Sequence, residues 1–249
     1  MTKDYRITFL GTSAVSASPR VATSACLIEL GETRIMVDAG IGALRQLRGT
    51  GLSADILDAI LITHWHLDHF AGLPGLIRSG ERLQPLPIFG PEPPSYVRAV
   101  LQVMCPAAIK HFTRVGQNSV LHFADLSVDS FPVSHITPAV GWILAEDSPG
   151  NRRLVISGDT RPIDATARAA RDVDLLVHEA TYLEKHRDKA VRTGHSTARE
   201  AATMAVKSGA KRLALTHVSP RYSAAEIAIE SRRVFREAVL PMPLSSISI

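Results

Sequence analysis

Four side chains that bind metals crowd into six residues directly after an apolar segment. His64, His66, Asp68 and His69 follow the segment Ala59-Ile-Leu-Ile-Thr. A short apolar run bounded by polar residues predicts a buried strand. Three imidazoles and a carboxylate are costly to bury unless a cation compensates them. The pattern therefore predicts a metal site at the carboxyl end of this strand, where open α/β sheets commonly place their sites.

The spacing within this cluster divides the four ligands into two pairs. Side-chain direction alternates along an extended chain, so His64 and His66 project to the same side and can share one cation. Asp68 and His69 stand where a helix begins, so they face another direction and can serve a second, nearby cation. The alternative is that the histidines cap and hydrogen-bond the turn without any metal.

The rest of the chain consists of short apolar runs and longer stretches with helical spacing. The runs predict strands at residues 7–10, 26–30, 35–37, 59–62, 86–89, 154–156, 175–177 and 213–215. The helical spacing predicts helices at residues 41–48, 96–104, 165–171, 197–207 and 224–239. Strands cluster before the first long helix and return at residues 121–144, which argues against a strictly alternating, doubly wound sheet. The sequence therefore predicts an α/β (α+β) fold in which two sheets are covered by helices.

Composition bounds the class of protein but not its chemistry. A hydrophobic fraction of 45% and a charged fraction of 21% are typical of a soluble globular protein. No low-complexity segment, fixed-period repeat or Ser- or Gly-rich linker interrupts the chain, so we expect one domain over residues 1–249. The net charge of +4 modestly favours acidic partners such as nucleic acid or phosphorylated metabolites, and it is too small to identify one.

Two cysteines restrict the kind of metal site that the chain can build. Cys26 and Cys105 cannot form a disulfide framework or a multi-cysteine zinc site, so any metal must be held by histidine and carboxylate. The first residues lack the pattern of a secretory signal, and no apolar run reaches membrane-spanning length. We therefore expect a cytoplasmic protein with no membrane partner.

Three more candidate ligands lie far along the chain, each just beyond an apolar run. They are His135, Asp159 and His217. Taken alone, the aspartate reads as a helix cap or turn residue and each histidine as a core residue with satisfied hydrogen bonds. Together with the first cluster they become candidate ligands of a two-metal site.

The order of the motifs resembles ribonuclease Z and its close phosphodiesterase relatives in the metallo-β-lactamase superfamily. The resemblance covers nearly the whole chain. The His-x-His-x-Asp-His run is specific only to the superfamily, whereas the later motifs point to the ribonuclease Z branch. The motifs are Phe9-Leu-Gly-Thr, Val37-Asp-Ala-Gly, Thr63-His-Trp-His-Leu-Asp-His, His135, Gly158-Asp-Thr-Arg-Pro, His178-Glu-Ala-Thr, Gly194-His-Ser-Thr and Thr216-His-Val-Ser-Pro-Arg-Tyr.

The resemblance implies an αββα sandwich with two zinc ions per chain. It assigns the first ion to His64, His66 and His135, the second to Asp68, His69 and His217, and a bridging position to Asp159. Manganese or iron can take the same histidine and carboxylate ligands in place of zinc. A homodimer is a further implication of the resemblance.

The same resemblance assigns the chemistry. A hydroxide that bridges the metals attacks the phosphodiester, with Asp68 as a ligand that also orients the hydroxide or accepts its proton. His195 gives a proton to the leaving oxygen, and Glu179 holds its imidazole. Arg221 is a candidate for binding the substrate phosphate. The alternatives are a solvated carboxylate at the end of a strand for Glu179 and a residue leading into a helix for His195.

Two departures from the ribonuclease Z pattern concern the substrate. Enzymes that grip the elbow of transfer RNA usually carry an inserted arm between the positions of His135 and Asp159, but this interval reads here as two core strands joined by Asp147-Ser-Pro-Gly. The segment that begins at Asp38 is also less polar than in the family. We therefore expect phosphodiester hydrolysis, with a transfer RNA precursor as one candidate substrate. The alternatives are a small, cyclic or aryl phosphodiester, an arylsulfate, or a non-catalytic binding protein with the same fold.

Overall fold

The computed structural model describes residues 3–17, 21–79 and 85–249. Its internal contacts divide the chain into two compact units. The first unit comprises Met1–Gly116 and Met242–Ser248, and the second comprises Gln117–Pro241 and Ile249. Each unit contains one sheet, and the single domain expected over residues 1–249 stays a prediction.

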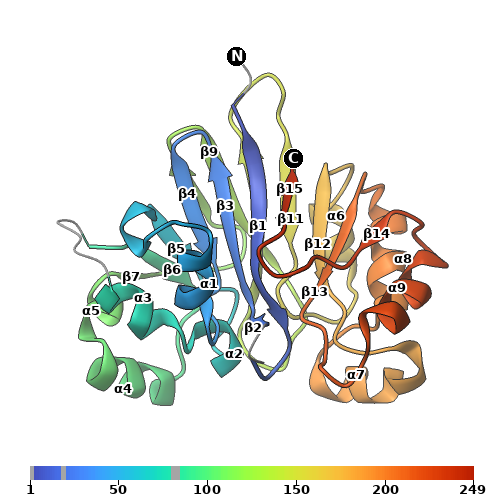
Figure 1. Cartoon of the computed structure of the whole chain (residues 1–249), viewed down its shortest axis with the longest axis horizontal. Coiled ribbons are helices and arrows are strands. Elements are labelled where there is room, and N and C mark those ends of the chain that lie inside the picture. The colour runs from blue at the N-terminus through green and yellow to red at the C-terminus, as the bar shows by residue number, and fades with distance from the viewer. Residues whose placement is uncertain (1–2, 18–20, 80–84) are drawn as a thin grey trace. The chain divides into compact units, whose positions relative to one another are not determined.

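The sheet of the first unit is mixed (Figure 1). Its strands are β1 (Tyr5–Ser13), β2 (Ala22–Thr23), β3 (Ala25–Leu30), β4 (Thr33–Val37), β5 (Ala59–Leu61), β6 (Ile88–Gly90), β7 (Phe112–Arg114) and β15 (Ser246–Ser248). The spatial order is β15-β1-β3-β4-β5-β6-β7, with β2 beside β1. β1, β3 and β4 pair antiparallel, whereas β4 to β7 pair in parallel.

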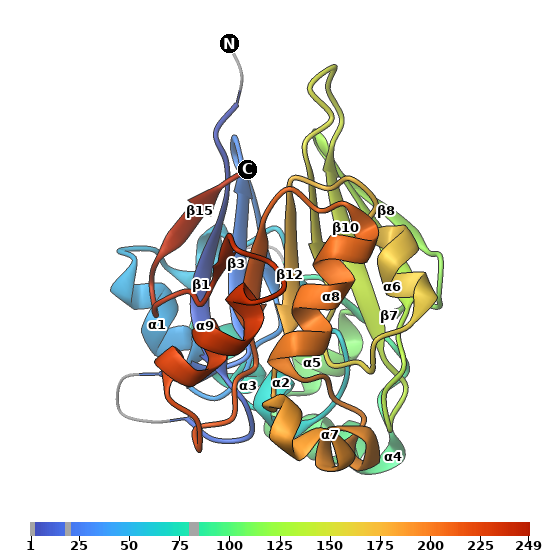
Figure 2. The same ribbon diagram turned by 90° about the vertical axis from the view of Figure 1, so that its right-hand side faces the viewer.

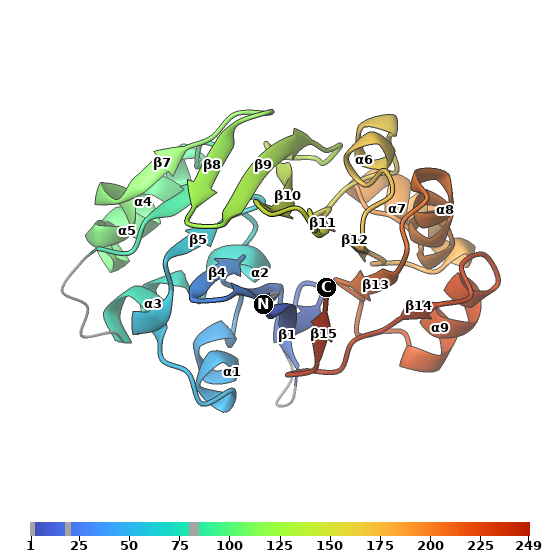
Figure 3. The ribbon, with the colours of Figure 1, turned by 90° about the horizontal axis from the view of Figure 1, so that it is seen from above.

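One face of this sheet is covered by helices of the same unit. They are α1 (Ala43–Gly49), η1 (Ala54–Ile56), α2 (Leu67–Phe70), α3 (Leu73–Ser79), α4 (Ser95–Met104) and α5 (Pro106–Lys110). Figure 3 shows α1 and α3 beside β4 and β5. Leu27, Met36 and Ile60 point from the strands into a core that also contains Leu47 of α1 and Leu76 of α3. Residues on both faces of β3 and β5 are buried, which explains why these strands read as continuous apolar runs in the sequence.

The second unit repeats this plan with a different strand order. Its strands are β8 (Val120–Phe123), β9 (Leu126–Pro132), β10 (Val140–Glu146), β11 (Arg153–Ile156), β12 (Leu175–Glu179), β13 (Leu213–Thr216) and β14 (Ala238–Val239). They lie in the order β14-β13-β12-β11-β10-β9-β8. The meander from β8 to β11 is antiparallel, and β11 to β14 are parallel.

Helices also cover the sheet of the second unit (Figure 2). They are α6 (Asp164–Ala169), η2 (Glu184–His186), α7 (Arg187–Thr193), α8 (Ala198–Ser208) and α9 (Ala224–Arg232). Small residues of α8, such as Ala201 and Ala205, pack in one cluster with Leu176 of β12 and Leu213 of β13, which brings the helix close to the sheet. Among all helices that the structure describes, none combines the length and the apolarity needed to cross a membrane.

The predicted fold class of two mixed sheets flanked by helices is confirmed. The prediction was wrong at the end of the last helix, which was expected to reach residue 239 but ends at Arg232. The backbone N–H groups of Val234 and Phe235 turn back to the carbonyl of Ser231, and Ala238 pairs with Leu213 of β13. The apolar residues there add a strand to the sheet because β13 offers a free edge for pairing.

The interval between His135 and Asp159 contains a plain hairpin. β10 and β11 pair antiparallel in the register Trp142 to Ile156 and Ala145 to Arg153. All residues of this interval are described, and those outside the two strands form only short connections. The sequence-based prediction that no arm is inserted here is confirmed.

His178 is a buried histidine that the fold holds in its neutral form. It lies in β12 with no exposed surface, and its Nδ1 lies 2.8 Å from the carbonyl oxygen of Glu179, to which it donates. Its Nε2 has no hydrogen-bond partner among the described residues. Burial lowers the pKa of His178 below its ordinary value of 6.5, because the charged ring would lose its hydration.

This burial predicts a pH-dependent loss of stability. Below pH 6.5 the unfolded chain binds a proton at residue 178 more readily than the folded chain does, which weakens folding by up to about 1.4 kcal/mol per pH unit. We expect His178→Asn to reduce the fall in unfolding free energy between pH 7.5 and 5.5, measured by urea titration at both pH values. His122→Asn, at an exposed side chain, is the control. An equal fall in wild type and His178→Asn would contradict the prediction.

Candidate metal centre

The first unit presents its cluster of candidate ligands directly after β5. His64 and His66 stand in extended chain, and Asp68 and His69 lie in the short helix α2. His64 Nε2 lies 3.0 Å from His66 Nδ1, so these two nitrogens face one position, as the spacing predicts. His64, Asp68 and His69 are buried, and the backbone N–H of Val15 donates to Asp68 Oδ2 at 2.7 Å.

Asp38, at the end of β4, organises this cluster. Its carboxylate accepts hydrogen bonds from the backbone and the hydroxyl of Thr63 at 2.8 and 2.9 Å and from His69 Nδ1 at 2.7 Å. Because Nδ1 of His69 carries the proton, its Nε2 keeps the lone pair that a metal needs. Ser24 Oγ lies 3.3 Å from that Nε2, so a hydroxyl meets the position that a cation would take.

The sequence-based interpretation missed this role of Asp38. The residue was noted only as part of family motifs, because its partners lie 25 and 31 positions further along the chain. The available signal was its position directly after a strand that neighbours β5. Its φ of 58° is uncommon for a residue other than glycine and marks a constrained turn.

Two glycines let the turn after β4 contact the backbone around α2. A Cβ atom at Gly40 would lie 2.3 Å from the carbonyl oxygen of Asp68, and one at Gly72 would lie 2.3 Å from the carbonyl oxygen of Gly40. Hydrogen bonds fix the contact, since Ala39 N donates to the His69 carbonyl at 2.7 Å and Gly72 N donates to the Ala39 carbonyl at 2.8 Å. The backbone of two candidate ligands is thus held by the segment that carries Asp38.

The second unit gathers its own cluster from four loops. His135 follows β9, Asp159 follows β11, His195 precedes α8 and His217 follows β13. Asp159 Oδ2 lies 3.4 Å from His217 Nε2, 4.0 Å from His135 Nε2 and 3.8 Å from His195 Nδ1. Asp159, His195 and His217 offer ligand atoms within 4.8 Å of one another, a spacing that one cation can occupy.

The surroundings of His135 favour a neutral ring. Its Nδ1 donates to the carbonyl of Gly194 at 2.9 Å, which leaves Nε2 on the side of Asp159. Burial lowers the pKa of His135, although the nearby charge of Asp159 opposes this shift. A neutral imidazole with one nitrogen hydrogen-bonded to the backbone is the form that metals bind.

Glu179 is fully buried at the end of β12, which contradicts its reading as a solvated carboxylate. Burial would raise its pKa, but the charge of His195 and the hydrogen bond from it outweigh burial and lower the pKa. Glu179 Oε1 lies 3.0 Å from His195 Nδ1 and accepts from it. The ring of His195 is held on its Nδ1 side, and its side chain keeps 12% of its surface exposed.

His195 stands next to a strongly capped helix without being its cap. Thr197 is the N-cap of α8, and it forms a capping box with Glu200. The guanidinium of Arg161 binds both oxygens of Glu200 and the backbone carbonyl of His195. The backbone N–H of Arg161 also donates to Ser134, beside His135, at 2.7 Å. Arg161 thus connects the segments that carry His135, Asp159 and His195, a role that the sequence did not reveal.

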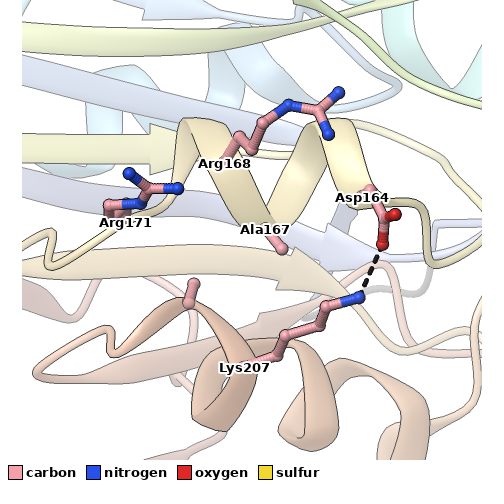
Figure 4. A pocket seen from close by; sticks show the side chains of 6 residues that line it. Asp164, Ala167, Arg168, Arg171 and Lys207 are labelled. Atoms are coloured by element: carbon pink, nitrogen blue, oxygen red, sulfur yellow. Dashed lines mark hydrogen bonds and ion pairs between the residues drawn. The ribbon is translucent and has the colours of Figure 1, made fainter.

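Arg221 and a pocket on the surface lie apart from these contacts. Arg221 is exposed in the loop that follows His217. The pocket, of about 350 Å³, lies between α6 and α8 and is lined by charged residues that include Arg168, Arg171 and the ion pair of Lys207 with Asp164 (Figure 4). No histidine lines it, so it is not a second metal centre.

Comparison with known proteins assigns the chain to a family. A family model described as the β-lactamase superfamily domain matches residues 33–218, which contain both clusters. The chain belongs to the metallo-β-lactamase superfamily. A metallo-β-lactamase fold protein of Bacillus subtilis, YhfI, has the same fold with a TM-score of 0.85, 21% identity and full coverage of both chains.

Curated relatives place the chain in the ribonuclease Z-like branch of this superfamily. The ribonuclease Z of Myxococcus xanthus is 34% identical over 87% of this chain and 88% of its own length. The ribonuclease Z of Archaeoglobus fulgidus is 29% identical over 98% of each chain. The crystal structure of the short form of human tRNase Z aligns with a TM-score of 0.81 and 30% identity over 98% of this chain and 99% of that one. Membership identifies the chain as a metal-dependent hydrolase.

The close contact at Gly72 predicts that alanine lowers the stability of the protein there but raises it at the nearby Gly75. We expect Gly72→Ala to lower the unfolding free energy by about 1–3 kcal/mol, because its Cβ would collide with backbone that cannot move aside alone. The control is Gly75→Ala in α3. Among the described residues its Cβ would meet only Leu44, at 3.7 Å, and we expect this variant to gain about 0.5–1 kcal/mol of helix stability. Urea unfolding measures both, and equal stability of the two variants would exclude this explanation.

Proposed function

We propose that this protein is a phosphodiesterase that works with two metal ions, zinc in the first instance. The ligands are His64, His66 and His135 for one ion, Asp68, His69 and His217 for the other, and Asp159 for both. The proposal draws on the family of the chain and on the chemistry of the donors. Histidine and carboxylate suit zinc, and they also accept manganese or iron.

One observation carries the proposal. Nδ1 of four of these histidines faces a protein acceptor, so that Nε2 is left for another partner. The pairs are His64 with Thr63 Oγ1 at 3.1 Å, His69 with Asp38 Oδ2 at 2.7 Å, His135 with the Gly194 carbonyl at 2.9 Å and His217 with Thr181 Oγ1 at 2.8 Å. This arrangement is typical of histidines that bind metals, whose second nitrogen is held by a carboxylate, carbonyl or hydroxyl. The buried His178 also donates from Nδ1, but among the described residues it joins no group of candidate ligand atoms.

The residues around the metals have separate tasks in this proposal. When bound, the two cations supply the Lewis acidity that activates water near neutral pH and offsets negative charge on a phosphoryl group. His195 donates a proton from Nε2 to the leaving oxygen, because Glu179 retains the proton on Nδ1. Asp68 binds metal with its carboxylate, one oxygen of which Val15 N holds in place.

The hairpin of β10 and β11 favours a small phosphodiester as a second candidate substrate beside precursor transfer RNA. It leaves no inserted arm between His135 and Asp159 with which to grip a transfer RNA at a distance. The alignment with the Archaeoglobus fulgidus enzyme runs over 300 residues, more than the 249 of this chain, so that relative carries residues that this chain lacks. Cleavage of RNA here would have to rely on contacts near the reacting bond.

Metal content and substrate range test this proposal with one preparation. We expect about two metal ions per chain by elemental analysis, loss of activity on bis(p-nitrophenyl) phosphate after chelation, and recovery when zinc or manganese is added. A precursor transfer RNA, a cyclic nucleotide and this aryl phosphodiester are then compared at equal metal content. Brisk aryl or cyclic hydrolysis without RNA cleavage rejects the processing role. Less than one metal per chain and no activity after metal addition would support a binding protein instead.

Removal of the proposed proton donor tests the assignment of His195. We expect His195→Ala to lower kcat by about 10² to 10⁴-fold while the metal content is unchanged. The loss should be larger for an RNA substrate than for the aryl ester, because p-nitrophenolate leaves readily without a proton. His122→Ala, at an exposed residue of β8, is the control. Equal losses on good and poor leaving groups would point to a structural role.

A further inference from the structure

Thr181 lies between two residues of the proposed site. It follows β12 directly and has only 2% of its surface exposed. Its hydroxyl oxygen lies 2.7 Å from Glu179 Oε2, 2.8 Å from His217 Nδ1 and 3.3 Å from His195 Nδ1. A single hydroxyl thus meets the carboxylate that holds the proposed proton donor and the ring of a proposed metal ligand.

The count of protons fixes the direction of these hydrogen bonds. Glu179 accepts from the backbone N–H groups of Thr160 and Thr181 and from His195, so its carboxylate acts only as an acceptor. The hydroxyl of Thr181 has one proton and gives it to Glu179 Oε2. Toward His217 the same oxygen can then only accept, so the proton of His217 must reside on Nδ1.

The backbone brings the ring of His217 to the hydroxyl of Thr181. The residue has φ 52°, in the left-handed region that is uncommon outside glycine. β12 and β13 pair in parallel with Glu179 opposite Thr216, and Ser219 N donates to the Thr181 carbonyl at 3.3 Å. These contacts bring Thr181 beside His217, and the branched Cβ of threonine restricts the rotation of the hydroxyl.

We propose that Thr181 is a positioning residue that links Glu179 to His217. Through it, one buried carboxylate orients both rings, His195 directly and His217 by way of the hydroxyl. The link sets the tautomer of His217 so that Nε2, which lies 3.4 Å from Asp159 Oδ2, has its lone pair ready for a metal. This inference rests on the proposed function, since it takes His217 as a ligand.

The test compares two substitutions of Thr181, one that removes its hydroxyl and one that removes its methyl group. Thr181→Val keeps the shape and removes the hydroxyl, whereas Thr181→Ser keeps the hydroxyl. We expect Thr181→Val to weaken zinc affinity about 10 to 100-fold in competition with a chromogenic chelator, and Thr181→Ser to stay within about threefold of wild type. The control is Thr166→Val, since the hydroxyl of Thr166 is buried but has no hydrogen-bond partner among the described residues.

A second measurement reads the tautomer without any metal. In metal-free protein labelled with ¹⁵N at histidine, we expect the His217 ring of wild type and Thr181→Ser to carry its proton on Nδ1. In Thr181→Val we expect the Nε2-protonated form to become populated. Urea unfolding of each variant shows whether it is folded. If Thr181 only supported the fold, Thr181→Val would not change the tautomer of His217.

The outcomes separate this inference from the proposed function. Unchanged zinc affinity and unchanged tautomer in Thr181→Val overturn the role of Thr181, as does an equal loss in the valine and serine variants. If wild-type protein binds no zinc, manganese or iron, the proposed function fails and the link to a metal fails with it. Tight binding in wild type with no effect of Thr181→Val leaves the proposed function standing and refutes only the inference.

Discussion

An imidazole can bind a cation only through a nitrogen that carries no proton, and the surrounding protein decides which nitrogen that is. In this chain hydrogen-bond acceptors hold the proton on Nδ1. They are a carboxylate for His69, a peptide carbonyl for His135 and a hydroxyl for His217. The rest of the architecture serves these acceptors. Each lies at the end of a strand or in a loop braced by backbone hydrogen bonds, so its position depends on the sheet and not on a flexible side chain.

Strand ends are suited to this task because parallel neighbours end side by side. β4 and β5 bring Asp38 within reach of residues that follow β5, and β12 and β13 do the same for Thr181 and His217. Hydrophobic burial supports the chemistry only indirectly, because it fixes the register of these strands. A shift of one residue would turn each of these side chains to the opposite face of its sheet.

The candidate ligands could be proposed from the sequence because their signal is local. His64, His66, Asp68 and His69 stand within six residues, and each remaining candidate follows a recognisable apolar run. The fold class was also accessible, since the apolar runs and helical stretches match most of the observed elements. The error at the last helix arose because residues near 238 have helical spacing in isolation, and only the open edge of β13 makes them a strand.

The supporting residues could not be found in this way. Asp38, Arg161 and Thr181 are ordinary polar residues in sequence, and apart from Glu179 beside Thr181 their partners in the candidate site lie 14 to 39 positions away. Nothing in a single chain shows which of its 24 acidic residues will meet a histidine. Only the fold reveals that Asp38 meets both Thr63 and His69, and that Arg161 contacts Ser134 through its backbone and Glu200 through its guanidinium.

The shared position of Glu179 affects how the kinetics of altered proteins should be read. Its two oxygens serve separate partners, since Oε1 accepts from His195 and Oε2 accepts from Thr181. A substitution at Glu179 would therefore disturb proton transfer and the support of His217 at the same time. A rate lost in such a variant is not a measure of either effect, and double-mutant cycles with His195 would show strong non-additivity. Substitutions at His195 or at Thr181, each of which meets one oxygen of Glu179, can separate the loss of proton transfer from the loss of support for His217.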